Sequence, residues 1–359
     1  MRFDRTSLQR ARTRAAASAL LLGVVALLLT FSALNDAFLT VDNFRNVFIQ
    51  ASVISVVAVP MALLLIAGKV DLSVGSTLAL GAVVTGLLIT DGVPLPLAIL
   101  AGVLAGAVVG LVNGLLVEVW DLSPIIVTLG ALTAVRGIAL TLAPDPVFGF
   151  PDGFLALGEN ELLGIPYLVL IAVAVFLLGA AVLARMPTGR HVYAIGVNPE
   201  AAYLSGVRVR RVGLWLFVAT GAAAALAGVM LAARLGSAPS GALGVGFELD
   251  VLTAVILGGI AFNGGRGTIA GVFLGVLFLG VLQNGLTLEN VPAATAMVVK
   301  GAVLVVAAGL DRVAVRSEAS AAKVLLGAAG RDPRAPSGRT GEAAQPELAA
   351  SVDTARAAR

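Results

Sequence analysis

Long apolar segments alternate with short polar ones along most of this chain, and most of the apolar segments are long enough to cross a membrane as helices. The predicted spans cover residues 15–34, 47–90 with a break at 68–76, 97–117, 125–142, 167–184, 213–234, 248–262, 268–288 and 293–310. Because the break divides residues 47–90 into two helices, about ten transmembrane helices are expected. The predicted fold class is an all-α polytopic membrane protein.

The first span has a competing interpretation as a cleaved signal peptide. Signal peptides usually have an apolar core of about 7–15 residues, and the run at 15–34 is longer than that. We therefore favour an anchored first helix.

The distribution of charge predicts the orientation of the chain. Residues 1–14 carry five arginines and one acid, whereas residues 144–166 carry four acids and no Lys or Arg. The central polar segment, residues 185–211, has a single acid, Glu200, against five arginines: Arg185, Arg190, Arg208, Arg210 and Arg211. Positively charged loops stay on the cytoplasmic side. Both termini and residues 185–211 are therefore predicted to be cytoplasmic, and residues 144–166 external.

The same pattern divides the chain into three parts. A basic cytoplasmic N-terminus, 1–14, precedes the transmembrane domain, 15–311. The tail, 312–359, consists mainly of Ala, Arg, Pro, Ser and Gly. It has too few large apolar side chains to form a core, so it is predicted to be a disordered cytoplasmic tail.

Composition agrees with a membrane protein and excludes several other classes. The chain is 58% hydrophobic and 13% charged, and its mean hydropathy of +1.00 is far above that of soluble globular proteins. Its basic residues are not interleaved with aromatic ones, so a nucleic-acid partner is not expected. With no cysteine and one histidine, His191, neither a disulfide framework nor a metal site is expected.

The central polar segment contains the signature of a short helix. Asn198 is a good N-cap, Pro199 suits the first helical position, Glu200 favours the positive end of the helix, and Gly206 can end it. The predicted helix covers residues 199–205. Its small and apolar side chains suit either a helix that lies on the membrane interface or one that docks in the groove of a partner protein.

A few polar groups interrupt the apolar spans. Asp71 lies in the break at 68–76, where its carboxylate can cap the next helix through the Ser73 or Val74 amide or can line a transport path. Arg136 and Lys300 lie within predicted spans, where lipid contact is costly, so both are expected to face the protein interior. The candidate translocation-path residues are Asp71, Ser73, Asn113, Thr128 and Arg136.

Four glycines recur at every fourth position of the span 97–117, and they form one row on a helix. They are Gly102, Gly106, Gly110 and Gly114. Such a row lets another helix approach closely, so close packing is predicted here.

The chain lacks a nucleotide-binding phosphate loop, since no GxxxxGK[ST] motif occurs. The glycine cluster NGGRG, residues 263–267, fits a tight turn better than a phosphate cradle. Any nucleotide that drives this protein is therefore expected on another subunit.

Seven stretches, in this order and spacing, resemble the membrane permeases of bacterial ABC importers for sugars, the ribose, xylose and galactose type. They lie between residues 43 and 311 and read GKVDLSVGSTLALGA, NGLLVEVWDLSPIIVTLGALTAVRGIAL, TGRHVYAIGVNPEAAYLSGVRVRRV, AALAGVMLAARLGSA, FELDVLTAVILGG, GGRGTIAGVFLG and VVKGAVLVVAAGLD. The chain departs from the family pattern at Lys69, where the family usually has glycine.

The resemblance implies a multi-pass permease of the bacterial plasma (inner) membrane that is not itself an enzyme. Two permease copies, or two related permeases, would join two cytoplasmic ABC ATPase subunits and an extracytoplasmic solute-binding protein. ATP and Mg would bind the ATPase, with no cofactor in this chain. The predicted loop helix would then be the coupling element, formed by Gly196, Asn198, Pro199, Glu200, Ala201, Ala202, Leu204, Ser205 and Gly206.

The favoured hypothesis is thus the pathway subunit of an ATP-driven importer of a monosaccharide or similar polyol. An ABC permease for branched-chain amino acids or another small solute is an alternative, since it would share the architecture. A secondary transporter that works alone is a further alternative, and it would need buried carboxylates for ion coupling.

Overall fold

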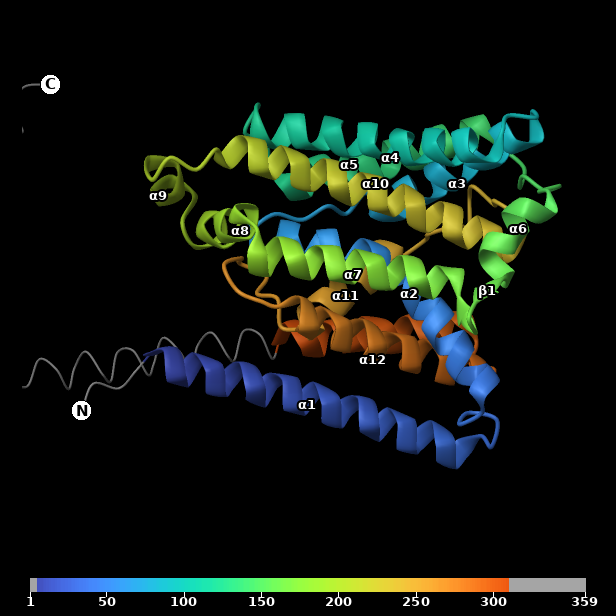
Figure 1. Ribbon diagram of the computed structural model, residues 1–359, viewed down its shortest axis with the longest axis horizontal. Coiled ribbons are helices and arrows are strands. Elements are labelled where there is room, and N and C mark those ends of the chain that lie inside the picture. The colour runs from blue at the N-terminus through green and yellow to red at the C-terminus, as the bar shows by residue number, and fades with distance from the viewer. Residues whose placement is uncertain (1–4, 310–359) are drawn as a thin grey trace, which may run out of the picture. The chain divides into compact units, whose positions relative to one another are not determined.

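The computed structural model describes residues 5–309, with side chains described from residue 18, and this part of the chain is mostly helical (Figure 1). The helices are α1 (Arg5–Leu34), α2 (Val41–Ile66), α3 (Val74–Thr90), α4 (Leu95–Glu118), α5 (Pro124–Leu142), α6 (Asp152–Glu159), α7 (Tyr167–Arg185), α8 (Pro187–Val197), α9 (Pro199–Leu204), α10 (Val209–Leu235), α11 (Phe247–Leu257) and α12 (Ile269–Leu288). A last apolar helix covers Ala293–Gly309. The predicted tail, 312–359, lies outside the described residues.

Six helices within residues 5–309 are long and apolar enough to cross a membrane: α2, α4, α5, α7, α10 and α12. Shorter apolar helices occupy Ser18–Leu34, α3 and Ala293–Gly309. Each predicted apolar segment contains a helix, so the expectation of a helical membrane domain is confirmed.

The helix α2 forms the centre of the fold. Most of its residues are apolar and most are buried, as expected for a helix enclosed by others. It contacts α7, α10, α11 and α12. By contrast, α4, α5 and α7 leave most of their apolar side chains at least partly exposed, so they form the perimeter of this single chain.

The predicted glycine row packs α4 tightly, three of its members against α10. A Cβ atom on Gly106 would overlap the carbonyl oxygen of Gly221, and one on Gly110 would overlap that of Phe217. The closeness is reciprocal, because a Cβ on Gly221 would overlap Gly106 O. Gly102 meets α3 in the same way. The prediction of close packing is therefore confirmed.

Two non-helical segments interrupt the helices. The first, residues 67–73, connects α2 to α3; α2 ends in a left-handed residue, Gly68, with Lys69 N bonded to Leu64 O at 3.0 Å and Gly68 N to Leu65 O at 2.9 Å. This is a Schellman motif. The second, residues 237–246, precedes α11, whose 11 residues span only about 16 Å. A non-helical backbone at membrane depth is tolerated only inside protein or beside water.

The central polar segment folds as two helices, where only one was predicted. Its first part, α8, was missed (Figure 1). In α9 the Asn198 side chain accepts from Ala201 N at 2.9 Å, and Gly206 adopts a φ of 85° after the last turn. The predicted N-cap, first-turn proline and glycine stop of α9 are confirmed, with the helix ending at Leu204.

At the opposite end of the bundle, residues 144–166 were predicted only as a loop. They contain the short helix α6 and a two-stranded antiparallel hairpin, β1 (Glu161–Leu162) and β2 (Ile165–Pro166). In Figure 1 this end lies to the right and the α8–α9 end to the left.

Candidate functional site

A fully buried carboxylate lies in the connection between α2 and α3. Asp71 Oδ1 accepts from Ser73 N at 2.9 Å and from Ser73 Oγ at 2.6 Å. Asn113 of α4 donates from Nδ2 to Ser73 Oγ at 2.9 Å and reaches both carboxylate oxygens at 3.5 Å. Three of the five predicted path residues thus form one buried cluster, and the predicted bond between Asp71 and the Ser73 amide is confirmed.

The lysine that departs from the family pattern does not pair with Asp71. Instead, Lys69 forms an ion pair with Glu118, and both side chains are largely buried. Glu118 falls just beyond the predicted span 97–117, but it is the last residue of α4, and its carboxylate lies directly against Gly213 of α10. A buried lysine requires a counter-charge; the sequence could not identify this one, because 49 residues separate the two.

Arg136 joins three elements of the bundle. Its Nη1 donates to Ser240 O and Leu243 O, each at 2.7 Å, and its Nη2 reaches Gly75 O at 3.4 Å. The guanidinium of α5 therefore ties the non-helical segment 237–246 to the first turn of α3. The prediction that Arg136 faces the protein is confirmed, although carbonyl oxygens of the main chain are its bonded partners.

Thr128 and Lys300, the remaining polar residues singled out in the spans, bond to other partners. Thr128 is fully buried, and its hydroxyl donates to Pro124 O of its own helix at 2.8 Å. Lys300 Nζ lies 2.8 Å from Asp250 Oδ2, so the last helix is paired with α11, and the interior position predicted for Lys300 is confirmed.

The helix α8 packs onto two main-chain turns at its own end of the bundle. Gly196 lies so close to Ile66 O and Gly265 N that a Cβ atom would overlap both, and Gly265 N itself donates to Ile66 O at 2.8 Å. Tyr193 donates its hydroxyl to Gly267 O at 2.7 Å. Burial raises the pKa of the Tyr193 phenol, so it stays a neutral donor at neutral pH. NGGRG, residues 263–267, is a tight turn as predicted.

Most of the predicted coupling residues are exposed, and the two exceptions are Gly196 and Ala202. Leu204 is 79% exposed, and the neighbouring Tyr203, which the sequence did not single out, is 70% exposed. Gly196 is half-buried on α8. Ala202 is only 4% exposed, so its methyl group packs within this chain and is not available to a partner's groove.

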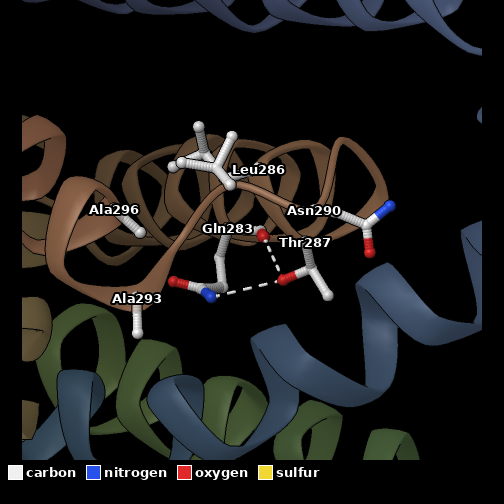
Figure 2. A pocket seen from close by; sticks show the side chains of 7 residues that line it. Gln283, Leu286, Thr287, Asn290, Ala293 and Ala296 are labelled. Carbon is white, nitrogen blue, oxygen red and sulfur yellow. Dashed lines mark hydrogen bonds between the residues drawn. The ribbon is translucent and has the colours of Figure 1, made fainter.

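A cavity of about 330 Å³ lies at the far end of α12, away from α8 and α9 (Figure 2). Gln283 and Thr287 point into it from α12 and are joined by a 3.5 Å hydrogen bond from Nε2 to Oγ1. The lining residues are Gln283, Leu286, Thr287, Asn290, Val291, Ala293 and Ala296. None of the predicted path residues lies here.

Buried polar side chains and interrupted helices inside an apolar bundle define a class of protein, the polytopic membrane transport protein. The profile of one family, described as "Branched-chain amino acid transport system / permease component", matches residues 43–308. The chain belongs to this family of permease components. It is thus a multi-pass protein of the bacterial inner membrane and a transport subunit rather than an enzyme.

Curated relatives cover most of the chain. The ribose import permease protein RbsC of Bacillus subtilis is 40% identical over 81% of this chain and 91% of its own length. The L-arabinose ABC transporter permease protein AraH of Azospirillum brasilense is 37% identical over 82% and 87%. The D-allose transport system permease protein AlsC of Escherichia coli is 37% identical over 77% and 85%. No solved structure matches the chain. Permeases of ABC importers work with separate ATPase and solute-binding partners.

Proposed function

We propose that this chain is the pathway subunit of an ATP-driven importer of a monosaccharide or similar polyol. The main support for this proposal is that three relatives named for ribose, arabinose and allose transport align with this chain over 85–91% of their own lengths. Ten transmembrane helices, with both termini in the cytoplasm, fit the arginine-rich segments and the apolar helices of the bundle.

The proposed partners follow from the exposed surfaces. The helix α9 presents Tyr203 and Leu204 to solvent, which suits the groove of a cytoplasmic ATPase subunit that binds ATP and Mg. The exposed apolar side chains of α4 and α5 suit lipid and a second permease, either an identical or a related one. A solute-binding protein would deliver the substrate at the α6 end.

Transport is proposed to follow alternating access. ATP-driven closure of the ATPase subunits would move the docked α9 helices, and with them the helices around the path. Asp71, Ser73, Asn113, Thr128 and Arg136 remain the candidate residues of that path.

Reconstitution of the permease with its ATPase and binding protein tests this function. Uptake of radiolabelled ribose, arabinose and allose into vesicles should require ATP and the binding protein, and excess leucine should not compete. Leucine uptake in place of sugar uptake would favour the amino-acid importer that the family description names. Solute uptake driven by an ion gradient, with no ATPase present, would contradict an ATP-driven importer.

A further inference from the structure

The non-helical connection 67–73 is linked to the elements on both sides of α9. It directly follows Ile66, the last residue of α2, whose carbonyl oxygen lies against Gly196 of α8 and beside Gly265 N. Further along the connection, Lys69 reaches Glu118, whose carboxylate lies against Gly213 near the start of α10. The helix α8 directly precedes α9, and α10 directly follows it. A displacement of α9 can therefore reach the connection both through α8 and through α10.

The contact beneath α8 leaves little room for slippage. No side chain separates Gly196 from the Ile66 carbonyl, and the Tyr193 hydroxyl binds the neighbouring turn at Gly267 O, 2.7 Å away. Densely packed backbone with specific hydrogen bonds transmits displacement, because it has few alternative arrangements. The end of α2 should therefore follow α8.

The contact through Lys69 and Glu118 is an ion pair that is largely shielded from solvent. The Glu118 side chain is 4% exposed and the Lys69 side chain 15%, and Arg210 of α10 adds a favourable charge interaction with the same carboxylate. Breaking such a pair leaves an uncompensated buried charge, which is strongly unfavourable. The pair is therefore expected to keep the connection against α10 when α10 moves.

Beyond Lys69 the connection leads directly to the buried polar groups. Asp71 and Ser73 bind Asn113, and the first turn of α3 offers Gly75 O to Arg136. The connection has no continuous helical hydrogen-bond ladder. Gly68 adopts a φ of 79°, and no atom lies within 4 Å of the position that a Cβ would take there. Segments of this kind absorb backbone rotation at hinges.

We propose that residues 67–73 are the element through which the α8–α9 loop acts on the buried Asp71 cluster, and that Lys69 and Glu118 are positioning residues in this transmission. This proposal rests on the proposed function, because it assumes that an ATPase moves α9. It assigns a role to the lysine that departs from the family pattern and to the acid at the end of α4 that pairs with it.

The test compares charge reversal with charge exchange in the reconstituted complex with ATPase and binding protein. Lys69→Glu and Glu118→Lys should each lower the stimulation of ATP hydrolysis by the sugar-loaded binding protein at least about fivefold, the lower range of coupling between sites. The double variant, with the charges exchanged, should restore stimulation. Hydrolysis is measured per assembled complex, so that a loss of assembly alone does not change the ratio. If a reversal prevents assembly, Glu118→Gln keeps the size of the side chain and gives the same readout.

Lys300 and Asp250 provide a matched control. This ion pair is also partly buried, at 2.8 Å, but it joins α11 to the last helix. Lys300→Glu should leave the stimulation ratio per complex unchanged. An equal fall in the Lys300 variant, or normal stimulation in both single variants of the Lys69–Glu118 pair, would overturn the proposal. If the unmodified complex shows no stimulation, the proposed function itself fails, which separates the two outcomes.

Discussion

At the scale of single residues, glycine decides how closely the central helices approach. On α4, Gly106 faces Gly221 of α10 at main-chain distance, whereas Gly137 of α5 faces open space. The spacing of the row was enough to predict a packing face, because four residues make slightly more than one helical turn. The sequence did not identify the partner helix, since that depends on where two segments about a hundred residues apart meet.

Substitution of Gly106 by Leu should therefore destabilise the protein. The new side chain would meet the main chain of α10, and overpacking of this kind typically costs about 1–3 kcal/mol. The midpoint of thermal unfolding in detergent should fall, as measured by the loss of monodisperse protein. Gly137→Leu is the control, because no atom lies within 4 Å of the position that a Cβ would take there. Equal losses in both variants would contradict close contact between Gly106 and α10 as the cause of the destabilisation.

Arg136 illustrates a residue whose environment could be predicted but whose partners could not. The cost of a charge in lipid predicted an interior position. Its guanidinium donates to Ser240 O and Leu243 O, which belong to a segment with no regular secondary structure. No periodic pattern in the sequence predicts the direction of main-chain carbonyls in such a segment.

Replacement of Arg136 by Met should leave two carbonyls without their donor, at about 1–3 kcal/mol for each unsatisfied buried group. Arg136→Lys should recover only part of this, because an ammonium group is a point donor without the planar fork of arginine. Thermal unfolding in detergent measures both. Arg45→Met is the comparison, since its pair with Glu161 is more exposed, at 41% and 33% of the side chains, and such pairs contribute only about 0–1 kcal/mol. A loss as large for Arg45 as for Arg136 would contradict this account.

At the scale of elements, the capping residues of α9 could be predicted from the sequence and α8 could not. Asn198, Pro199 and Gly206 act through local geometry, which the sequence encodes directly. In α8, by contrast, Gly189 and Gly196 lower the helix propensity. Both glycines are needed for close approach, to α7 and to the end of α2 respectively. Tertiary packing therefore stabilises a helix that local propensity disfavours.

The exposed face of α9 provides a prediction about docking. Leu204→Glu should leave membrane insertion intact, because insertion is set by the apolar spans and the flanking arginines. It should reduce co-purification of the ATPase and, with it, sugar uptake. Leu163→Glu is the matched control for ATPase co-purification, as Leu163 is 96% exposed between β1 and β2 at the other end of the bundle. Normal uptake in Leu204→Glu would contradict a docking role for α9. Ala202 is unsuitable for this test, because its burial within the chain would make any large side chain disruptive.

At the scale of the whole molecule, apolar length predicted which segments are helical, and arginine distribution predicted an orientation. The short α11 and the segment 237–246 before it were harder to interpret, because a non-helical stretch inside the bundle is stabilised by partners such as Arg136 and not by its own sequence. The buried ion pair between Lys69 and Glu118 has the same origin. Long-range pairing of this kind is a property of the assembled bundle.

The orientation can be tested directly because the chain contains no cysteine. The protein without cysteine supplies an unlabelled background, and Leu163→Cys and Leu204→Cys each introduce one thiol at a position that is at least 79% exposed. If the α6 end is external, a membrane-impermeant maleimide should label Leu163→Cys in intact cells. It should label Leu204→Cys only after the cells are made permeable, because α9 lies on the arginine-rich side. Labelling of Leu204→Cys in intact cells would place α9 outside, where no ATPase could reach it, and the proposed coupling would fail with the topology.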